Sequence, residues 1–219
     1  MEWEPSLGEF SRFSLDEVSQ CFFTDSEGMI ELWSPPRLTF TKPFIDGADP
    51  DLINEFSNRL ISVSQYFPEI KGEIKIGMTT SYKGLAMTES DGNVMMKKIS
   101  FPPLKKSGLP SRYVMGHEMM HIVQAKQSSI PGTERATDVH TLARLPPVFI
   151  DHAPIYLRVP KEIRRNWSHS RINPIVSELA HDLAIEAVIT RRTNPRYIRW
   201  WESNFDERVD RNSSLSRFF

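Results

Sequence analysis

The sequence has a single cysteine, Cys21, among its 219 residues, so no disulfide can form within the chain. It also lacks any apolar run that approaches the ~20 residues of a membrane-spanning helix, and it contains no visible repeat. Neither sign of charge is in excess, because 27 basic and 28 acidic residues give a net charge of −1. This balance argues neither for nor against a nucleic-acid partner. The start of the chain, 1–10, is acidic where a signal peptide would be basic, so we expect a cytoplasmic protein with no membrane partner.

Two histidines, His117 and His121, stand four residues apart in a stretch that we expect to be helical, 107–128. Residues four apart lie about 40° from each other round a helix axis, so both imidazoles can point at one metal ion. Glu118 points aside by about 100° and can contact a water on that ion without ligating it. The HExxH spacing therefore predicts two metal ligands and one general base.

A third ligand decides between classes of HExxH site. The metzincin continuation would need Gly and His where this chain has Gln124 and Gln127, so that class is excluded. His140 is a possible third ligand. Glu134 is a better one, for the local reasons that follow.

Residues 131–132 are Pro-Gly, a turn signal, and Thr133 is a residue typical of helix N-caps. A second helix can therefore start there, with Glu134 in its first turn. Asp138 lies four residues further on the same helix face, where its carboxylate could accept the outer N–H of a ligand histidine.

An HExxH motif followed by a helix that carries ExxxD resembles the gluzincins, the thermolysin-like metallopeptidases. The short interval from the motif to the glutamate is most similar to their small soluble members, the minigluzincins. The resemblance is specific over 116–138, although Thr133 stands where thermolysin has Asn, and the second half of the chain does not match thermolysin's C-terminal domain. It implies hydrolysis of peptide bonds by a metal-activated water in a peptide or protein substrate. The implied site consists of one zinc ion, its ligands His117, His121 and Glu134, the general base Glu118, and Asp138 hydrogen-bonded behind the ligands.

The hydrophobic pattern predicts an α+β fold at 37–201, between an N-terminal appendage at 1–36 and a polar tail at 202–219. Strands are expected at 37–44, 74–78, 84–88 and 94–101, with turns at 46–50 and 90–93. Helices are expected at 51–67, 107–128 and 173–192, besides the one that bears Glu134. This order resembles the zincins, with a small mixed sheet, an HExxH helix, a glutamate-bearing helix and C-terminal helices.

Substrate-binding residues are predicted in two places. In the gluzincins an edge strand above the metal binds an extended substrate, and by order Gly84, Leu85 and Ala86 resemble that strand; an ordinary hairpin arm is the alternative. Hydrolysis also needs a donor for the oxyanion, besides the zinc. Three residues of the Pro-rich stretch 145–175 are candidates, although packing or surface roles are the alternative: His152, Tyr156 and Arg158.

A different class of function follows from an uneven distribution of charge. Arginines and lysines interleave with aromatic residues over 158–201, whereas 1–60 is rich in Asp and Glu. Such a region could bind a nucleic acid, which would indicate a nucleic-acid-associated protease or a binding protein that retains a metal. Pairing of the basic half with the acidic half is favoured instead, because the net charge is close to zero.

The tail at 202–219 ends in Phe218 and Phe219, apolar groups that need a docking place. One place is a cleft for extended peptide, which would make the full-length chain latent. Packing on the outside of the 173–192 helix, or in a dimer contact, is the alternative.

Overall fold

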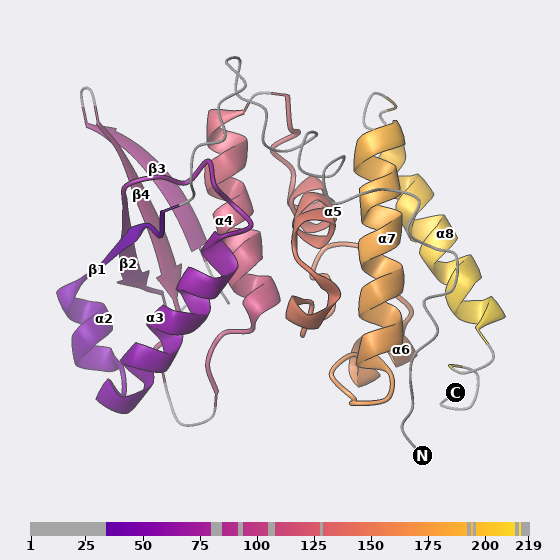
Figure 1. Cartoon of the computed structure of the whole chain (residues 1–219), viewed down its shortest axis with the longest axis horizontal. Coiled ribbons are helices and arrows are strands. Elements are labelled where there is room, and N and C mark those ends of the chain that lie inside the picture. Colours follow the sequence, from indigo (N-terminus) through magenta and orange to yellow (C-terminus); the bar gives the residue numbers. More distant parts are fainter. Residues whose placement is uncertain are drawn as a thin grey trace. The chain divides into compact units, whose positions relative to one another are not determined.

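The computed structural model describes residues 34–79, 85–91, 94–104, 108–127, 129–191, 194, 196–212 and 215; for 85–91, 94–97 and 191 it describes the backbone only (Figure 1). Most of the predicted appendage at 1–36 therefore lies outside the described residues. So do Gly84 and the terminal pair Phe218 and Phe219, on which the latency hypothesis depends.

Four strands form one mixed sheet in the order β1-β2-β4-β3. They are β1 (Arg37–Phe40), β2 (Glu73–Met78), β3 (Leu85–Asp91) and β4 (Val94–Phe101). β1, β2 and β4 are parallel, and β3 runs antiparallel to β4 at the edge of the sheet. In β2, Ile74 and Ile76 are buried while Glu73 and Lys75 are exposed, as the alternation predicts. The α+β class and the small mixed sheet are confirmed.

Helices α2 (Lys42–Gly47) and α3 (Pro50–Ser64) follow β1. The first corrects the sequence prediction, which continued a strand to residue 44 and placed a turn at 46–50. Pro43 suits the first turn of α2, because its missing N–H would have no partner there. Asp49 caps α3 by accepting a hydrogen bond from the Asp51 N–H, at 3.2 Å. The buried apolar side chains of α3 are Phe56, Leu60 and Val63.

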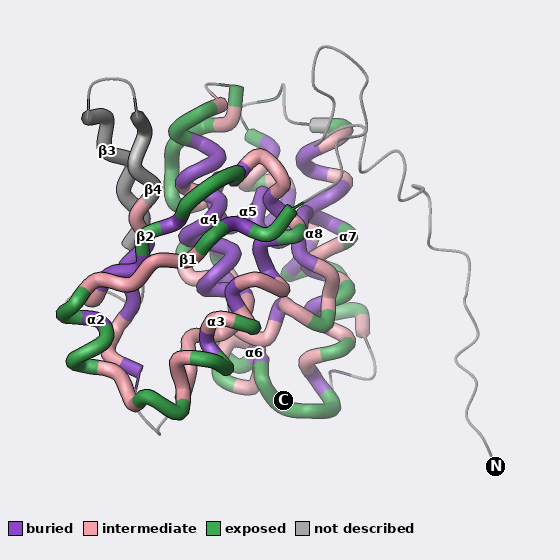
Figure 2. Tube along the Cα trace, turned by 60° about the vertical axis from the view of Figure 1, so that its left-hand side comes forward, coloured by how far each residue is buried: buried purple, intermediate pink, exposed green. Residues whose placement is uncertain are grey.

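Helices α4 (Arg112–Lys126) and α5 (Glu134–Arg144) lie between the sheet and the C-terminal helices (Figure 1). Figure 2 shows both as largely buried. The two helices approach closely at Gly116, where an added Cβ would lie 2.8 Å from Leu145 Cδ1 and 3.3 Å from Thr141 Cγ2. A glycine directly before the first histidine therefore sets the distance between the helices.

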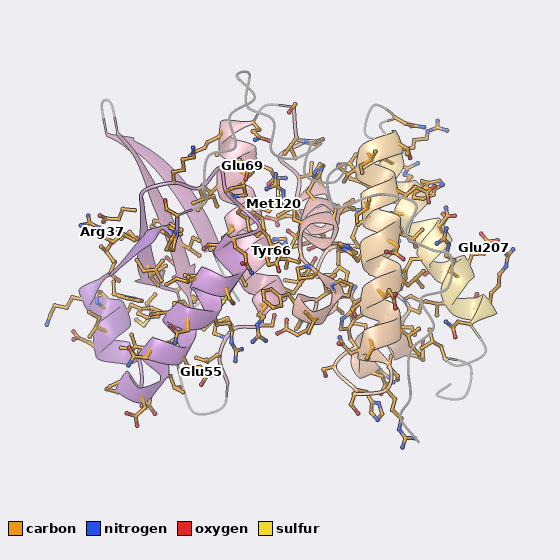
Figure 3. All side chains as sticks on the ribbon, viewed as in Figure 1. Arg37, Glu55, Tyr66, Glu69, Met120 and Glu207 are labelled. Carbon is orange, nitrogen blue, oxygen red and sulfur yellow. The ribbon has the colours of Figure 1, made fainter. Side chains whose placement is uncertain are left out.

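A buried arginine links α5 to the segment after α3. Both guanidinium NH2 groups of Arg144 donate to the Glu69 carboxylate, at 2.9 and 2.6 Å, and one also donates to the Tyr66 carbonyl; Figure 3 labels Tyr66 and Glu69. Its guanidinium also lies over the Phe67 ring, 5.4 Å from the ring centroid. These contacts hold α5 in place from the side of α3.

The C-terminal part contains the short η1 (Pro147–Phe149) and α6 (Lys161–Asn166), and the longer α7 (Asn173–Arg191) and α8 (Tyr197–Arg211). α7 confirms the helix predicted at 173–192. α8 is a correction, because the predicted boundary between domain and tail at 201 falls inside it. Trp201, Phe205 and Val209 of α8 are buried, and the Trp201 indole N–H donates to the Ala180 carbonyl of α7 at 3.1 Å. Residues 202–211 are thus part of the packed domain.

Among the helices of the described ranges, none is both long and apolar enough to cross a bilayer.

Candidate metal centre

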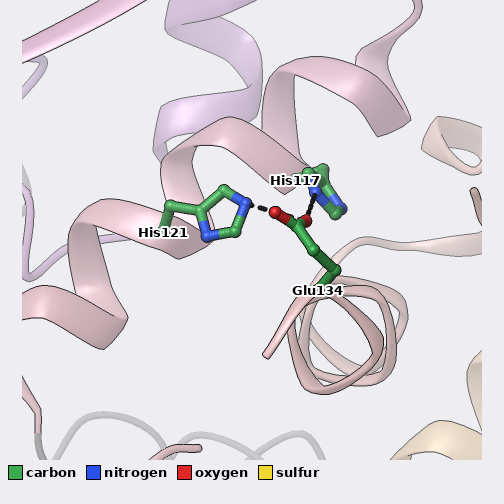
Figure 4. Close-up of side chains that lie close together, drawn as sticks. All are labelled: His117, His121 and Glu134. Carbon is green, nitrogen blue, oxygen red and sulfur yellow. Dashed lines mark hydrogen bonds and ion pairs between the residues drawn. The ribbon is translucent and has the colours of Figure 1, made fainter. Parts of the chain in front are cut away.

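Three side chains from two helices converge at one point (Figure 4). His117 Nε2 lies 3.0 Å and His121 Nε2 lies 3.2 Å from the same carboxylate oxygen of Glu134, Oε2. The three potential ligand atoms all lie within 4.8 Å of one another. The sequence predicted this set, and the structure brings it together.

Local structure explains the convergence. His117 and His121 are one turn apart on α4, with ring centroids 4.9 Å apart. Glu134 is the first residue of α5, which Thr133 caps by accepting a hydrogen bond from the Ala136 N–H at 3.3 Å. The cap places Glu134 at the start of the helix, so its side chain can reach back toward α4.

Asp138 lies behind His117 and is fully buried. Its Oδ1 is 2.9 Å from His117 Nδ1 and accepts a 2.6 Å hydrogen bond from the Tyr113 hydroxyl. Its Oδ2 accepts from the backbone N–H groups of Tyr156 and Leu157, at 2.6 and 3.1 Å. Four partners occupy the carboxylate. When Nδ1 of His117 carries the ring proton, it donates to Asp138, and the lone pair of Nε2 points toward Glu134. Asp138 therefore accepts the outer N–H of this histidine, as the sequence predicted.

His121 has a corresponding partner that sequence reasoning missed. Its Nδ1 lies 3.1 Å from the amide oxygen of Gln124. That oxygen also accepts a 2.9 Å hydrogen bond from the Thr137 hydroxyl, and the Gln124 amide nitrogen donates to the Pro131 carbonyl at 2.7 Å. Gln124 therefore holds the His121 ring from behind, as Asp138 holds His117. The available signal was a polar residue three positions after His121, on the same helix face.

The side chains stabilise positive charge at this point. Burial alone would lower the pKa of His117, but its hydrogen bonds to Asp138 and Glu134 raise that pKa to about 9. Burial and the nearby His117 lower the pKa of His121. The hydrogen bond from His117 lowers the pKa of Glu134, against the effect of its partial burial. A cation at the centre would meet two nitrogens and an ionised carboxylate.

The donor set fits a divalent metal. Two imidazole nitrogens and one carboxylate oxygen are ligands that zinc and other first-row transition metals accept. In each histidine, the nitrogen that faces away from the cluster, Nδ1, lies within hydrogen-bonding distance of a side-chain oxygen. Such a contact fixes the tautomer of a ligating histidine. The described residues can therefore hold a metal ion.

Glu118 lies next to the possible metal ligands on α4, whereas His140 lies outside their cluster. Glu118 is 5% exposed, next to His117 on α4, and its charge contributes to the raised pKa of His117. Its role as general base stays a prediction. His140, the alternative third ligand, does not belong to the cluster, because its ring lies edge-on beside Tyr197 with centroids 6.2 Å apart.

The candidate substrate residues separate into four places. The Tyr156 ring stacks on His117 with centroids 5.7 Å apart, and the residue is 47% exposed. Arg158 and His152 line two different cavities, the first with Arg135 and the second with Asp151 and Trp167. Leu85 and Ala86 lie in the edge strand β3, whose side chains are outside the described part of the chain, as is all of Gly84.

The basic and aromatic region at 158–201 is less suited to binding a nucleic acid than its sequence indicated. Three of its four aromatic residues, Trp167, Tyr197 and Trp201, are at most 3% exposed, so they cannot stack on bases. The Arg164 guanidinium donates to the backbone carbonyls of Pro154 and Leu157. These residues support the fold.

Comparisons with protein-family models, with curated proteins and with solved structures each find no match for this chain.

Proposed function

We propose that the protein is a zinc-dependent metallopeptidase of the gluzincin type, with a zincin-like arrangement of its sheet and helices. The observation that carries the proposal is the convergence of His117 Nε2, His121 Nε2 and Glu134 Oε2, with the outer nitrogens of both rings held by Asp138 and Gln124. An accidental HExxH sequence would need none of these supporting contacts.

The ligands of the ion would be His117, His121 and Glu134. When bound, Zn²⁺ supplies Lewis acidity, which makes a water more acidic and a carbonyl more electrophilic. Glu118 would accept the proton of the attacking water and pass it to the leaving amine. Its place next to His117 on α4 suits this task, because the base would then belong to the helix that carries both histidine ligands.

Tyr156 is our candidate for the side chain that faces the reacting carbonyl. Its backbone N–H is held by Asp138 at 2.6 Å while its ring lies over His117 and remains nearly half exposed. A residue fixed by the same carboxylate that orients a ligand histidine keeps a constant position relative to the ion. Its hydroxyl would donate to the oxyanion.

The edge strand β3 supports binding of an extended peptide. β3 packs beside α4 and pairs with β4 on one side, and it is the last strand of the sheet among the described residues. A peptide could add to its outer edge by main-chain hydrogen bonds, with Leu85 and Ala86 at the start of the strand.

The proposal is tested by turnover of a quenched-fluorescent peptide library with the zinc-loaded protein. We expect cleavage by the wild type, inhibition by a zinc chelator, recovery on adding Zn²⁺, and no cleavage by Glu118→Gln. A zinc-loaded wild type that cleaves no member of the library, or a Glu118→Gln variant as fast as wild type, would refute the proposal.

A further inference from the structure

A cavity of about 330 Å³ lies where α5, the segment after Leu157 and α8 meet. Arginines come to it from all three elements. The lining consists of Arg135, Arg158, Arg199, Glu202, Ser203 and Asp206.

One face of α8 forms a wall of this cavity. Arg199, Ser203 and Asp206 are separated by four and three residues, a spacing that keeps them on one side of a helix. The opposite side carries Trp201 and Phe205, which are buried against the domain. The polar wall is therefore fixed by the packing of α8.

Glu202 is already engaged. Its Oε2 accepts from the Arg135 guanidinium at 2.5 Å, and its Oε1 accepts from the Arg158 backbone N–H at 2.9 Å. Glu202 is 6% exposed, so this pair forms part of the cavity wall.

The guanidinium groups of Arg158 and Arg199 are free for a ligand. Both residues are exposed, and neither guanidinium has a hydrogen-bond or ion-pair partner among the described residues. Only Asp206 remains to oppose them, so the cavity has a surplus of positive charge. Two forked guanidinium groups match the geometry of a carboxylate.

Two residues of the lining lie close in sequence to residues of the metal centre. Arg135 directly follows the ligand Glu134 on α5, and Arg158 is two residues after Tyr156, whose ring stacks on His117. Neighbouring Cα atoms are about 3.8 Å apart and an extended peptide advances ~3.4 Å per residue. A peptide bound at the centre could thus present a group to the cavity from a residue near the scissile bond.

We propose that this cavity is a subsite for a carboxylate of the peptide substrate, bound by Arg158 and Arg199. The inference rests on the proposed function and adds a preference for anionic substrates. The carboxylate comes either from an Asp or Glu side chain or from the C-terminus of the peptide, and both offer the same two oxygens.

The experiment measures peptide binding to the zinc-loaded Glu118→Gln variant by fluorescence anisotropy. One set of peptides carries Glu or Gln at each position in turn, and a second set compares a free C-terminal acid with its amide. We expect the anionic member of one set to bind about tenfold more tightly, the size of effect that a charge-assisted hydrogen bond gives. The set that shows the preference identifies the source of the carboxylate.

Adding Arg158→Gln and Arg199→Gln to the Glu118→Gln variant should abolish the preference, and Arg199→Glu should reverse it toward Lys-containing peptides. Arg165→Gln, an exposed arginine of α6 outside the cavity, is the matched control and should keep it. Equal binding of both members in every pair, or a preference that survives the double arginine substitution, would overturn the inference.

The same variants separate this inference from the proposed function. In the active Glu118 background, the double arginine variant should lose the advantage that anionic peptides have over neutral ones. If the wild type binds anionic peptides through these arginines but cleaves none, the cavity stands as an anion site and the peptidase proposal fails.

Discussion

The amide oxygen of Gln124 lies 3.1 Å from Nδ1 of His121, on the opposite edge of the ring from Glu134. This contact gives His121 the support that Asp138 gives His117. A hydrogen bond to the outer nitrogen fixes the tautomer and ring orientation of a ligating histidine.

Gln124→Leu should therefore weaken metal binding by about 10-fold while the protein stays folded. Competition with a chelating dye measures the affinity. Gln127→Leu, one turn from the contact on the same segment, is the control and should bind metal like the wild type. Equal affinities for Gln124→Leu and Gln127→Leu would show that the contact does not act on the ligand.

Asp138→Ala should weaken metal binding by about 10–100-fold without abolishing it. It should also lower the unfolding temperature, because Tyr113, His117 and the backbone of Tyr156 and Leu157 lose a buried acceptor. Asp138→Asn should fall between wild type and Asp138→Ala, since an amide offers one acceptor oxygen. Wild-type metal affinity in Asp138→Ala would contradict the role of this carboxylate.

Gly116→Ala should destabilise the protein by roughly 1–2 kcal/mol, although alanine is the better helix former. The added Cβ would lie 2.8 Å from Leu145 Cδ1 in a contact between α4 and α5 that has little room. Denaturant unfolding of Gly116→Ala, Leu145→Ala and the double variant measures the coupling. The double variant should lose less stability than the two single variants together, and strict additivity would rule out the clash.

The metal-free protein should lose stability as the pH rises from about 6.5 to about 9, because the pKa of His117 is raised to about 9 in the folded state. A raised histidine pKa adds stability that is complete below the unfolded value of 6.5 and is lost as the pH passes the folded value. The lowered pKa values of His121 and Glu134 act below this range. Unfolding temperatures of chelator-treated protein across these pH values test the trend.

The His117→Gln variant is the control for that experiment, and its stability should change less over the same interval. A slope equal to that of the wild type would assign the pH dependence to another group.

The metal ligands were predictable because their spacing is local. His117 and His121 are held by one helix turn, and Glu134 by a turn signal and a cap, so the sequence contains their geometry. Gln124 was not predictable in this way. Its role depends on Thr137 and Pro131, which reach it only after α4 and α5 have packed together.

The missed helix α8 has a different cause. Tyr197, Trp201, Phe205 and Val209 are each four residues apart, a helical spacing, and all are buried. The high polar content of 202–211 concealed this pattern, because most of its other positions are exposed. The short helix α2 was missed because a six-residue element has too few positions to show a period.

Metal content of the purified protein tests the central claim most directly, when the wild type is measured beside Glu134→Ala, His140→Ala and Glu118→Gln. If His117, His121 and Glu134 hold the ion, the wild type, His140→Ala and Glu118→Gln contain stoichiometric zinc, and Glu134→Ala loses it. Stoichiometric zinc in Glu134→Ala together with its loss from His140→Ala would contradict the account.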